Sequence, residues 1–306
     1  MPELPEVEVV RLGLAPAVTD ALVTGVEVLD SRALTRHDGD ARDFEGRLLG
    51  RHILGAARRG KFLWMPLSAA SGTDPASRAE ALVAHLGMSG QMLLRAPGAI
   101  RDESAGRHLR VRVMLEHPEH GELEVKFVDQ RTFGSLALDP LVPTADGRPA
   151  GWGAAAALVP SQVAHIARDP LDPAFNDALL REAFARKGSA VKRVLLDQTV
   201  LSGVGNIYAD ESLWAARIHP STPAAELSTR AVNRLLAEVR SVLQKALAEG
   251  GTSFDAQYVN VNGQAGYFAH SLNAYGREAQ PCPRCGTPIV RDAFMNRSSH
   301  FCPRCQ

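Results

Sequence analysis

The chain begins Met1-Pro2-Glu3-Leu4-Pro5-Glu6-Val7-Glu8, a stretch with a proline at position 2 and acidic residues close behind it. Removal of the initiator methionine, which is usual before a small residue, would leave the secondary amine of Pro2 at the start of the chain. An α-amine has a pKa near ~8, against ~10.4 for lysine, so a usable fraction is uncharged and nucleophilic at neutral pH. Glu3 and Glu6 lie close enough in sequence to move protons for this amine. Because amines form imines with aldehyde-like carbons, Pro2 is a candidate nucleophile.

The same stretch also has the features of a helix start. Pro5 suits the first position of a helix, and Glu6 and Glu8 suit its positive end. Val7 and Val10 then begin an apolar face. The two interpretations are compatible, because a helix start is a good place to hold an amine rigidly.

The composition predicts a soluble globular protein with room for two or three domains. The chain has 306 residues, of which 45% are hydrophobic and 22% charged. No apolar run approaches the ~18 residues of a membrane span, and no signal peptide precedes the acidic start, so we expect a cytoplasmic protein. The 34 basic residues equal the 34 acidic ones, which argues against a general polyanion binder. From Gly276 onward, however, five arginines outnumber two carboxylates, and such a local excess matters more than the sum.

All four cysteines lie near the end of the chain, in two Cys-x-x-Cys pairs. Cys282 and Cys285 form the first pair, and Cys302 and Cys305 the second, with sixteen residues between the pairs. This spacing predicts one structural Zn²⁺ held by four thiolates, with no open position for a catalytic water. Redox-active pairs are the alternative, but the chain offers no thioredoxin-like context. The hairpin between the pairs carries Arg297 in a basic tip, which suits either a nucleic-acid groove or a protein contact.

The first half of the sequence is typical of β-structure. Residues 23–65 predict short strands broken by glycines, and further strands are expected over residues 82–93, 108–115 and 123–128. The segment Arg58-Arg59-Gly60-Lys61 places three cations just before an apolar strand. Such a cluster is either a solvated face or a place where Lys61 meets a phosphate.

Two loops in this half carry candidate wedges for a stacked substrate. Met88 lies in a turn between Gly87 and Gly90, although methionine usually fills cores. Arg131 and Phe133 lie on the same side of a strand or bend. The alternative for the second loop is a pair of Asp129 with Arg131 beside a core phenylalanine. The histidines of the hairpin tip at residues 117–121 are given no metal role.

The second half is predicted to be helical. Residues 139–161, rich in proline, glycine and alanine, read as a linker. Helices are expected over residues 175–186, 189–197, 207–216 and 227–249, with Asn206 as a helix cap. Most helical hairpins bind nothing, but here a glycine-rich helix start that can take a phosphate is accompanied by cations. These cations are Arg186, Lys187, Lys192 and Arg193.

Taken together, these motifs resemble the formamidopyrimidine-DNA glycosylase family, bacterial base-excision repair enzymes that remove oxidised purines. The resemblance covers essentially the whole chain, with the motifs in family order. The matching segments are the opening Pro-Glu-Leu-Pro-Glu-Val-Glu, residues 59–61, 85–90, 129–134 and 196–211, and the terminal cysteine pairs. Departures are small: residues 72–80 and 117–121 look inserted, and Ala167-Arg168 replace a more usual Gly-Pro pair.

The resemblance implies an α+β multi-domain fold. An N-terminal helix and β-sandwich would form a catalytic domain over residues 1–142, followed by a linker over 143–160. A helix–two-turn–helix DNA-binding domain would span residues 161–275 and include a purine-specific lesion-capping loop at Tyr258–Tyr267. A four-cysteine zinc finger would occupy residues 276–306.

It also implies a bifunctional DNA glycosylase and AP lyase, acting as a monomer on damaged double-stranded DNA at the bacterial nucleoid, with no membrane partner. Pro2 matches the Schiff-base nucleophile, Glu3 the acid/base beside it, and Glu6 a support for the amine. Lys61 matches the lysine of β-elimination and phosphate contact, and Arg297 the residue of δ-elimination. The DNA-binding residues would be Met88, Arg131 and Phe133, which fill the gap left by an everted nucleotide, and His108, Lys187, Lys192, Asn206 and Arg297.

Two alternatives to this activity remain. A member of the same family could act as an endonuclease on oxidised pyrimidines, although the glycine-rich loop at residues 258–267 favours purines. A protein with the same fold could bind damaged DNA without catalysis, but the intact Pro2, Glu3 and Lys61 argue against this.

Overall fold

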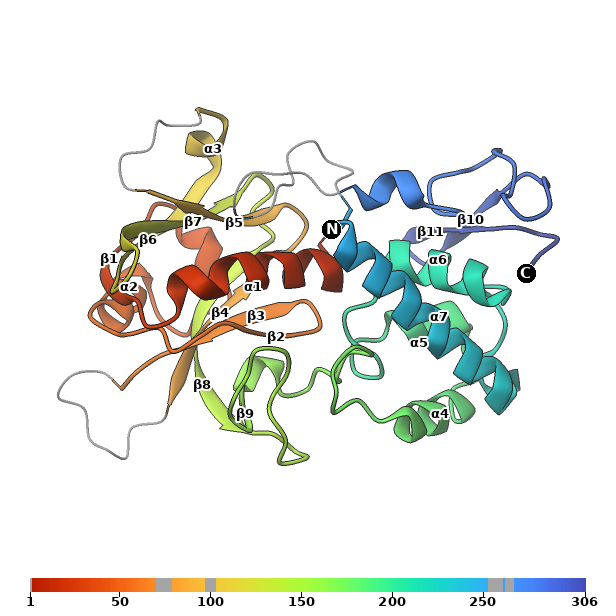
Figure 1. Cartoon of the computed structure of the whole chain (residues 1–306), viewed down its shortest axis with the longest axis horizontal. Coiled ribbons are helices and arrows are strands. Elements are labelled where there is room, and N and C mark those ends of the chain that lie inside the picture. Colours follow the sequence, from red (N-terminus) through yellow and green to blue (C-terminus); the bar gives the residue numbers. More distant parts are fainter. Residues whose placement is uncertain (1, 70–78, 97–102, 253–260, 262–266) are drawn as a thin grey trace. The chain divides into compact units, whose positions relative to one another are not determined.

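The computed structural model describes residues 2–69, 79–96, 103–252, 261 and 267–306, which form two compact units. Unit 1 contains Pro2, residues 6–165 and Val261, and unit 2 contains Glu3–Pro5, residues 166–252 and residues 267–306 (Figure 1). The expected lesion-capping loop, except Val261 and Tyr267, lies outside the described residues. Within the described ranges, no helix combines the length and the apolar character needed to cross a membrane.

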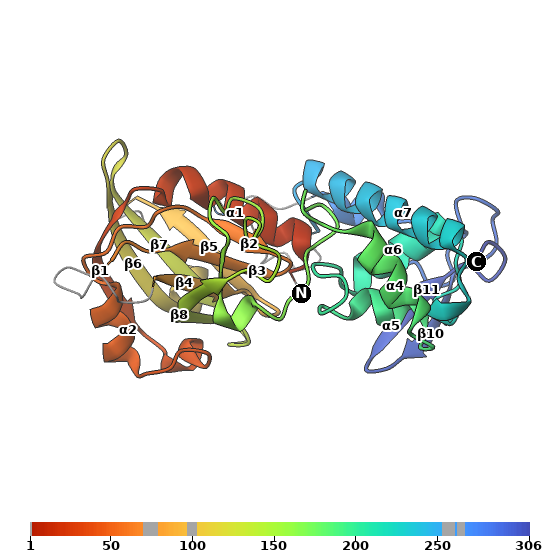
Figure 2. The ribbon, with the colours of Figure 1, turned by 90° about the horizontal axis from the view of Figure 1, so that it is seen from below.

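Unit 1 is built on two antiparallel sheets, which confirms the predicted β-sandwich (Figure 2). One sheet has the order β1-β6-β7-β5 and the other the order β2-β3-β4-β8-β9. The strands are β1 (Leu22–Val28), β2 (Ala57–Arg59), β3 (Phe62–Pro66), β4 (Glu80–His85), β5 (Gly90–Arg95), β6 (Leu109–His117), β7 (Gly121–Asp129), β8 (Ser135–Pro143) and β9 (Leu158–Pro160). The last of these strands lies within the stretch expected as a linker and pairs with β8.

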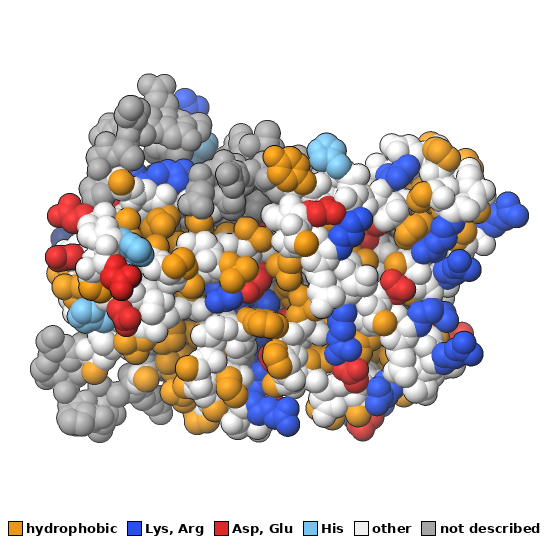
Figure 3. All heavy atoms as spheres, viewed as in Figure 1, with side chains coloured by type: hydrophobic (Ala, Val, Ile, Leu, Met, Phe, Trp, Pro, Cys, Tyr) orange, Lys and Arg blue, Asp and Glu red, His pale blue; other side chains and the backbone are white. Residues whose placement is uncertain are grey.

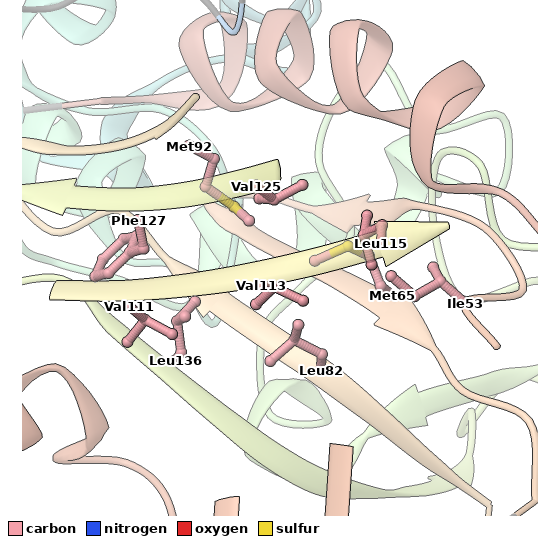
Figure 4. A pocket seen from close by; sticks show the side chains of 10 residues that line it. All are labelled: Ile53, Met65, Leu82, Met92, Val111, Val113, Leu115, Val125, Phe127 and Leu136. Carbon is pink, nitrogen blue, oxygen red and sulfur yellow. The ribbon is translucent and has the colours of Figure 1, made fainter. Parts of the chain in front are cut away.

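The apolar inner faces of the two sheets form the core of unit 1. Met65, Leu82, Val113 and Phe127 come from strands of both sheets and surround one small cavity of about 10 Å³ (Figure 4). A void of this size with an apolar lining is at the lower limit for one water molecule and offers it no polar partner. Helix α1 (Leu4–Val18) buries one face, beginning with Val7, in the same core.

The prediction of strands throughout residues 23–65 was wrong for one segment. Residues Ala41–Leu48 form helix α2, and a 3₁₀ helix, η1, covers Ser31–Leu34. The α2 start is fixed by Asp40, whose side chain accepts a hydrogen bond from the Asp43 N–H. Phe44 and Leu48, four residues apart, are the buried residues of this helix. An N-cap followed by one apolar stripe is a helix signal that the glycine-broken pattern of the region obscured.

Two further helical segments belong to the described part of unit 1, in which one expected strand is also missing. A short helix, α3 (Glu103–His108), precedes β6, so the strand expected from residue 108 begins one residue later. A 3₁₀ helix, η2 (Ser161–Val163), follows β9. Residues 53–56, expected to be in a strand, form only an isolated bridge through Ile53 before β2 begins at Ala57.

Unit 2 is the predicted helical domain together with the cysteine-bearing end of the chain. Asn176 and Ser228 cap α4 and α7 with their side chains, as their positions before helical patterns require. The helical segments are α4 (Asp177–Ala185), α5 (Val191–Leu196), α6 (Asn206–Ala216), η3 (Ala224–Glu226), α7 (Thr229–Ala248) and η4 (Phe268–Ser271). Their apolar faces form one core, to which Leu4 also belongs. In the space-filling view, basic side chains recur over the surface of these helices and the finger (Figure 3).

The finger is a two-stranded antiparallel hairpin, β10 (Val290–Phe294) and β11 (Arg297–Phe301). Its tip turns at Met295, which adopts a left-handed φ of 54°. The described fold therefore confirms the expected fold class, a helix and sheets followed by a helical domain and a four-cysteine finger.

Candidate functional site

Glu3 is fixed by the start of helix α6. Its carboxylate accepts hydrogen bonds from the backbone N–H of Gly205 at 2.7 Å and of Ile207 at 3.3 Å. The residue is 3% exposed, and the Leu4 N–H donates to the Gly203 carbonyl at 3.0 Å. A helix N-terminus carries unpaired N–H groups and a positive dipole, so it is a favourable place for a carboxylate group. The acid that follows Pro2 in the sequence is therefore held by backbone amides of the helix start.

Only glycine fits where the carboxylate is held. A Cβ on Gly205 would lie 2.2 Å from the Glu3 carboxyl carbon. Gly203, with a left-handed φ of 88°, would place a Cβ 2.6 Å from Leu4. The glycines of this turn thus permit the close approach of Glu3 and Leu4.

The expectation that Asn206 caps α6 was wrong. The N-cap position belongs to Gly205, which has no side chain to contribute, and Glu3 takes the capping role from a distant part of the sequence. Asn206 is the first residue of the helix, and its side-chain amide donates to the Ser298 carbonyl at 3.0 Å. This residue therefore links α6 to the finger hairpin.

Lys192 lies beneath that hairpin, with its side chain fully buried. Its Nζ is 2.6 Å from Asp210 Oδ1 and donates to the Ser298 carbonyl at 2.9 Å and to Ser299 Oγ at 3.1 Å. The other Asp210 oxygen accepts the His300 N–H at 2.9 Å. Burial lowers the pKa of Lys192 although Asp210 opposes the shift. A side chain with this environment has no surface to offer DNA, in contrast to the sequence-based expectation.

Lys187 and Arg297 line one hollow of about 600 Å³ in unit 2. Its walls come from the α4–α5 connection, α5 and the hairpin tip, with Arg193 and Asn296 as further polar members. Lys187 pairs with Asp197 at 3.0 Å, and Arg297 is exposed. The hollow is lined by three basic side chains, Lys187, Arg193 and Arg297, and by the carboxylate of Asp197.

In unit 1, the residues beside α1 and the β2–β3 turn are buried. Pro2 and Glu6 have little exposure, and so does Lys61 at 9%. Arg58 donates to Glu8 Oε2 at 2.7 Å, and Arg59 donates to the Ala150 carbonyl at 2.7 Å. The basic segment before β3 is therefore not a solvated face, and Lys61 lies largely buried on the β2–β3 turn.

One carboxylate joins the two loops that carry the wedge candidates. Asp129 accepts hydrogen bonds from the Ser89 hydroxyl at 2.6 Å, the Arg131 N–H at 3.1 Å and the Gly134 N–H at 2.7 Å. Phe133 is consequently 62% exposed rather than part of the core. The side chains Met88, Arg131 and Phe133 thus project from loops that are tied to each other.

The Met88 loop is also fixed by the contacts of Gly87, the residue before Met88. Gly87 has a left-handed φ of 59°, and a Cβ there would lie 2.4 Å from the Phe133 carbonyl carbon. The Gly87 N–H donates to His85 Nδ1 at 3.2 Å. Burial, and then the positive charges of Arg36 and Lys61, lower the pKa of His85 to about 4. The ring is therefore neutral near pH 7 and remains a hydrogen-bond acceptor for this loop.

His108 is the last residue of α3 and is partly exposed. It lies just before β6, whose partner strand β7 leads into the loop of Arg131 and Phe133. The structure thus brings His108 to the sheet that carries the wedge loops.

The four cysteines gather as a metal site requires. Their sulfurs lie within 4.8 Å of one another, and Cys285 and Cys302 Sγ are 3.5 Å apart. A tetrahedral ion with Zn–S bonds of ~2.3 Å separates its sulfurs by ~3.8 Å, whereas a disulfide needs ~2.05 Å. The four-thiolate donor set and its spacing fit Zn²⁺, and all four cysteines are unpaired.

Family models match three successive parts of this chain. The formamidopyrimidine-DNA glycosylase N-terminal domain matches residues 1–136 and the H2TH domain of the same enzymes residues 166–257. The zinc finger found in FPG and IleRS matches residues 279–306. The chain belongs to the formamidopyrimidine-DNA glycosylase family.

Full-length relatives agree with this assignment. The formamidopyrimidine-DNA glycosylase of Leifsonia xyli subsp. xyli is 65% identical, covering 100% of this chain and 99% of that protein. The enzyme of Thermobifida fusca is 54% identical, covering 100% and 97%. Among solved structures, Lactococcus lactis Fpg in complex with abasic-site DNA has a TM-score of 0.78 at 27% identity, covering 99% of each chain. A point mutant of that enzyme in complex with Fapy-dG DNA has a TM-score of 0.79 at 28% identity, covering 100% and 99%.

In this member of the formamidopyrimidine-DNA glycosylase family, several positioning residues were absent from the sequence-based set. Asp129 and Asp210 are buried carboxylates that organise a loop pair and the finger hairpin. Glu211 accepts the N–H groups of Ala274 at 2.7 Å and Tyr275 at 2.8 Å, which fixes the entry to the finger. Their only sequence signal was an acid within an otherwise apolar or glycine-rich segment.

Proposed function

We propose that the protein is a bifunctional DNA glycosylase and AP lyase of base-excision repair that removes 8-oxoguanine and formamidopyrimidines. The observation that carries the proposal is the carboxylate of Glu3, held by the Gly205 and Ile207 amides directly after Pro2 in the chain. A rigid acid beside a terminal secondary amine is what imine chemistry needs. Membership of a family of DNA glycosylases acting on damaged DNA agrees with it.

The reaction begins at Pro2. Once Met1 is removed, the lone pair of the Pro2 nitrogen attacks C1′ of the damaged nucleoside, and the bond from C1′ to the base breaks. Glu3 moves the protons of this step, with Glu6 supporting the amine. The C1′–O4′ bond then breaks as O4′ takes up a proton and the sugar ring opens, which leaves a permanently cationic iminium between C1′ and the secondary amine. This iminium is an electron sink that acidifies the C2′ hydrogen. Loss of that proton expels the 3′ phosphate, and a second elimination expels the 5′ phosphate.

The cations of the site act on the eliminations and on the DNA backbone. Lys61, on the β2–β3 turn, serves β-elimination and contacts phosphate. Arg297 at the exposed hairpin tip serves δ-elimination and, with Lys187 in the same hollow, binds phosphate. Asn206 and His108 add phosphate contacts. Such contacts set the register of the DNA and carry little sequence information, as a lesion-scanning enzyme needs.

The exposed loops of unit 1 make the damaged base accessible. A base inside a duplex must be flipped out, at a cost of about a few kcal/mol. Met88 and Phe133 can occupy the vacated space with apolar side chains, and Arg131 can meet the opposite strand. Because Asp129 ties both loops together, the three side chains enter as one unit.

Lys192 has a different role from the one expected for a DNA-binding cation. We assign it to holding the finger hairpin, and so Arg297, through Asp210 and Ser299. One structural Zn²⁺ held by Cys282, Cys285, Cys302 and Cys305 folds the finger and supplies no catalytic water. We further propose that the protein works as a monomer on double-stranded DNA in the bacterial cytoplasm.

The lesion class is tested by comparing excision rates on duplexes that differ only in the damaged base. We expect 8-oxoguanine to be removed faster than thymine glycol by the same preparation. A neighbour in structure, Lactococcus lactis Fpg, is known in complex with DNA containing an oxidised pyrimidine, so the ratio of rates rather than mere activity is the readout. A faster rate on thymine glycol would assign the protein to the pyrimidine-specific type. Binding without any excision or strand cleavage would make it a damage binder.

A further inference from the structure

Three arginines surround the exposed side of the cysteine cluster. Arg217, Arg284 and Arg304 line one hollow of about 540 Å³ together with Cys285 and Cys305. These two cysteines are half-buried, whereas Cys282 and Cys302 lie in a small apolar core around Trp214. The positive charges therefore gather on the side of the cluster that solvent reaches.

Arg284 is part of the frame of this hollow. Its two terminal nitrogens donate to the carbonyls of Trp214 at 2.6 Å and Ala215 at 3.1 Å, and its guanidinium lies 3.7 Å from the centre of the Trp214 ring. It thereby satisfies carbonyls at the negative end of α6. Substitution of Arg284 would remove the contacts that hold the finger against the helix as well as a positive charge. Its effect could therefore not be assigned to the charge alone.

Arg217 occupies a position where glycine would be expected. It ends α6 in the left-handed conformation, with φ 55° and ψ 49°, and its N–H donates to the Leu213 and Trp214 carbonyls. Helices that end in this way usually have glycine there, because a Cβ disfavours the conformation. The Arg217 side chain is exposed and contributes nothing to the core. Its presence therefore needs a reason outside the helix, and the hollow supplies one.

A zinc ion with four thiolates carries a net charge of minus two, concentrated on the sulfurs. We propose that Arg217, Arg284 and Arg304 act as the counter-charge of this centre, making the exposed thiolates less nucleophilic and attracting small anions into the hollow. This inference rests on the proposed zinc site. It concerns how the finger keeps its metal in the presence of electrophiles and not how the enzyme cleaves DNA.

The test uses two alkylating agents of the same chemistry and different charge. In each reaction a cysteine sulfur displaces iodide from a CH₂ group, forming an S–C bond as the C–I bond breaks. Iodoacetamide is neutral and iodoacetate is an anion, so the ratio of their rates reports the electrostatic potential at the sulfurs and cancels differences in exposure. All four cysteines of the chain lie in the finger, so alkylation reads this site alone. Zinc release, followed with a metal-sensitive dye, gives a second readout.

Arg217→Gly and Arg304→Gln are the informative variants of the full-length protein. The first removes a charge while giving the helix end its preferred residue, so misfolding cannot explain its effect. For each charge removed, the iodoacetate-to-iodoacetamide ratio should fall by about two- to threefold at low salt, the effect of one unit charge about 6 to 10 Å away in water. The absolute iodoacetamide rate should rise. High salt should reduce the difference from wild type.

Arg291→Gln is the matched control, because Arg291 is an exposed arginine on β10 outside the hollow. It should leave the ratio at the wild-type value. An unchanged ratio in the Arg217→Gly, Arg304→Gln double variant would overturn the inference. The zinc content of the wild-type protein is measured separately: less than one equivalent would contradict the proposed zinc site, whatever the ratio shows.

Discussion

At the scale of single residues, Gly205 determines where the Glu3 carboxylate can lie. Its missing side chain lets the Glu3 carboxylate approach two backbone amides. In Gly205→Ala the new methyl group must displace that carboxylate. We expect base excision to fall by on the order of 10²-fold, as for loss of a positioned general acid. Stability should fall by only about 1–2 kcal/mol, the value of a helix cap.

Gly46→Ala, at an exposed position of helix α2, is the control for this prediction. A Cβ at Gly46 meets nothing within 4 Å, so the same change in composition leaves the environment untouched. Excision of 8-oxoguanine by Gly46→Ala should match wild type in single-turnover assays. Equal activity of Gly205→Ala would show that the position of Glu3 is unimportant.

His85 makes the stability of unit 1 depend on pH. Its pKa is about 4 in the folded protein, against an ordinary value of 6.5, so the unfolded chain binds more protons between these values. Stability contributed by the neutral ring is complete above pH 6.5 and is lost as the pH falls toward 4. Between pH 7 and 4.5 we expect a loss of about 2–3 kcal/mol from this residue.

Denaturant titrations at the two pH values measure the effect, followed by tryptophan fluorescence, to which the buried Trp64 on β3 contributes from unit 1. The control is His85→Gln, whose side-chain carbonyl can still accept the Gly87 N–H but does not titrate. The pH-dependent loss should be smaller in this variant by the amount assigned to His85. The same loss in both proteins would assign the acid sensitivity to other groups.

At the scale of elements, the buried pair Lys192–Asp210 joins α5 and α6 to the finger hairpin. Lys192→Met leaves Asp210 buried without its cation and should cost about 3–5 kcal/mol, much of which Asp210→Asn should restore in the double variant. DNA affinity should fall because the finger hairpin is no longer held in place. The slope of log affinity against log salt should stay unchanged, because no phosphate contact of Lys192 is lost. By contrast, Lys187→Ala should reduce that slope by about 1.

The salt slope distinguishes a lysine that positions the hairpin, as proposed for Lys192, from a lysine that contacts phosphate, as proposed for Lys187. The double variant Lys192→Met, Asp210→Asn is the sample of choice, because it should fold. A reduction of its slope by about 1 would mean that Lys192 reaches a phosphate, contrary to its position in the structure.

The elements also show which parts of the fold could be predicted. Strands and helices with strong local patterns, such as β6, β7 and α7, could be read from period and caps. Helix α2 could not, because glycines on both sides imitate a series of short strands. The cap of α6 was beyond any local pattern, since Glu3 precedes Gly205 by about two hundred residues and reaches it only through tertiary structure.

At the scale of the whole molecule, the family and the fold class could be predicted because their signatures are sequence-local. The opening stretch and the paired cysteines are short motifs whose residues lie close together in the sequence. The roles of Lys192 and Asp129 could not be predicted in this way, because burial decides whether a charge faces DNA or the protein. Lys192 looked like one cation among four, and only its full burial separates it from Lys187.

The proposed reaction of the whole molecule depends on a free terminal amine. A residue or tag retained before Pro2 converts that amine into a tertiary amide without an available lone pair. We expect such a protein to fold and to bind lesion DNA through Arg131, Lys187 and Arg297, but to lose both base excision and strand cleavage. Pro2→Gly keeps a primary amine and should retain some cleavage of abasic DNA.

The most direct test is borohydride trapping on 8-oxoguanine duplex, comparing the protein with a free Pro2 terminus and the same protein with an uncleaved N-terminal extension. Reduction of the imine should give a covalent protein–DNA complex with the free terminus and none with the extension, at equal DNA binding. Full excision and trapping by the extended protein would contradict the account and direct the search for the nucleophile to Lys61.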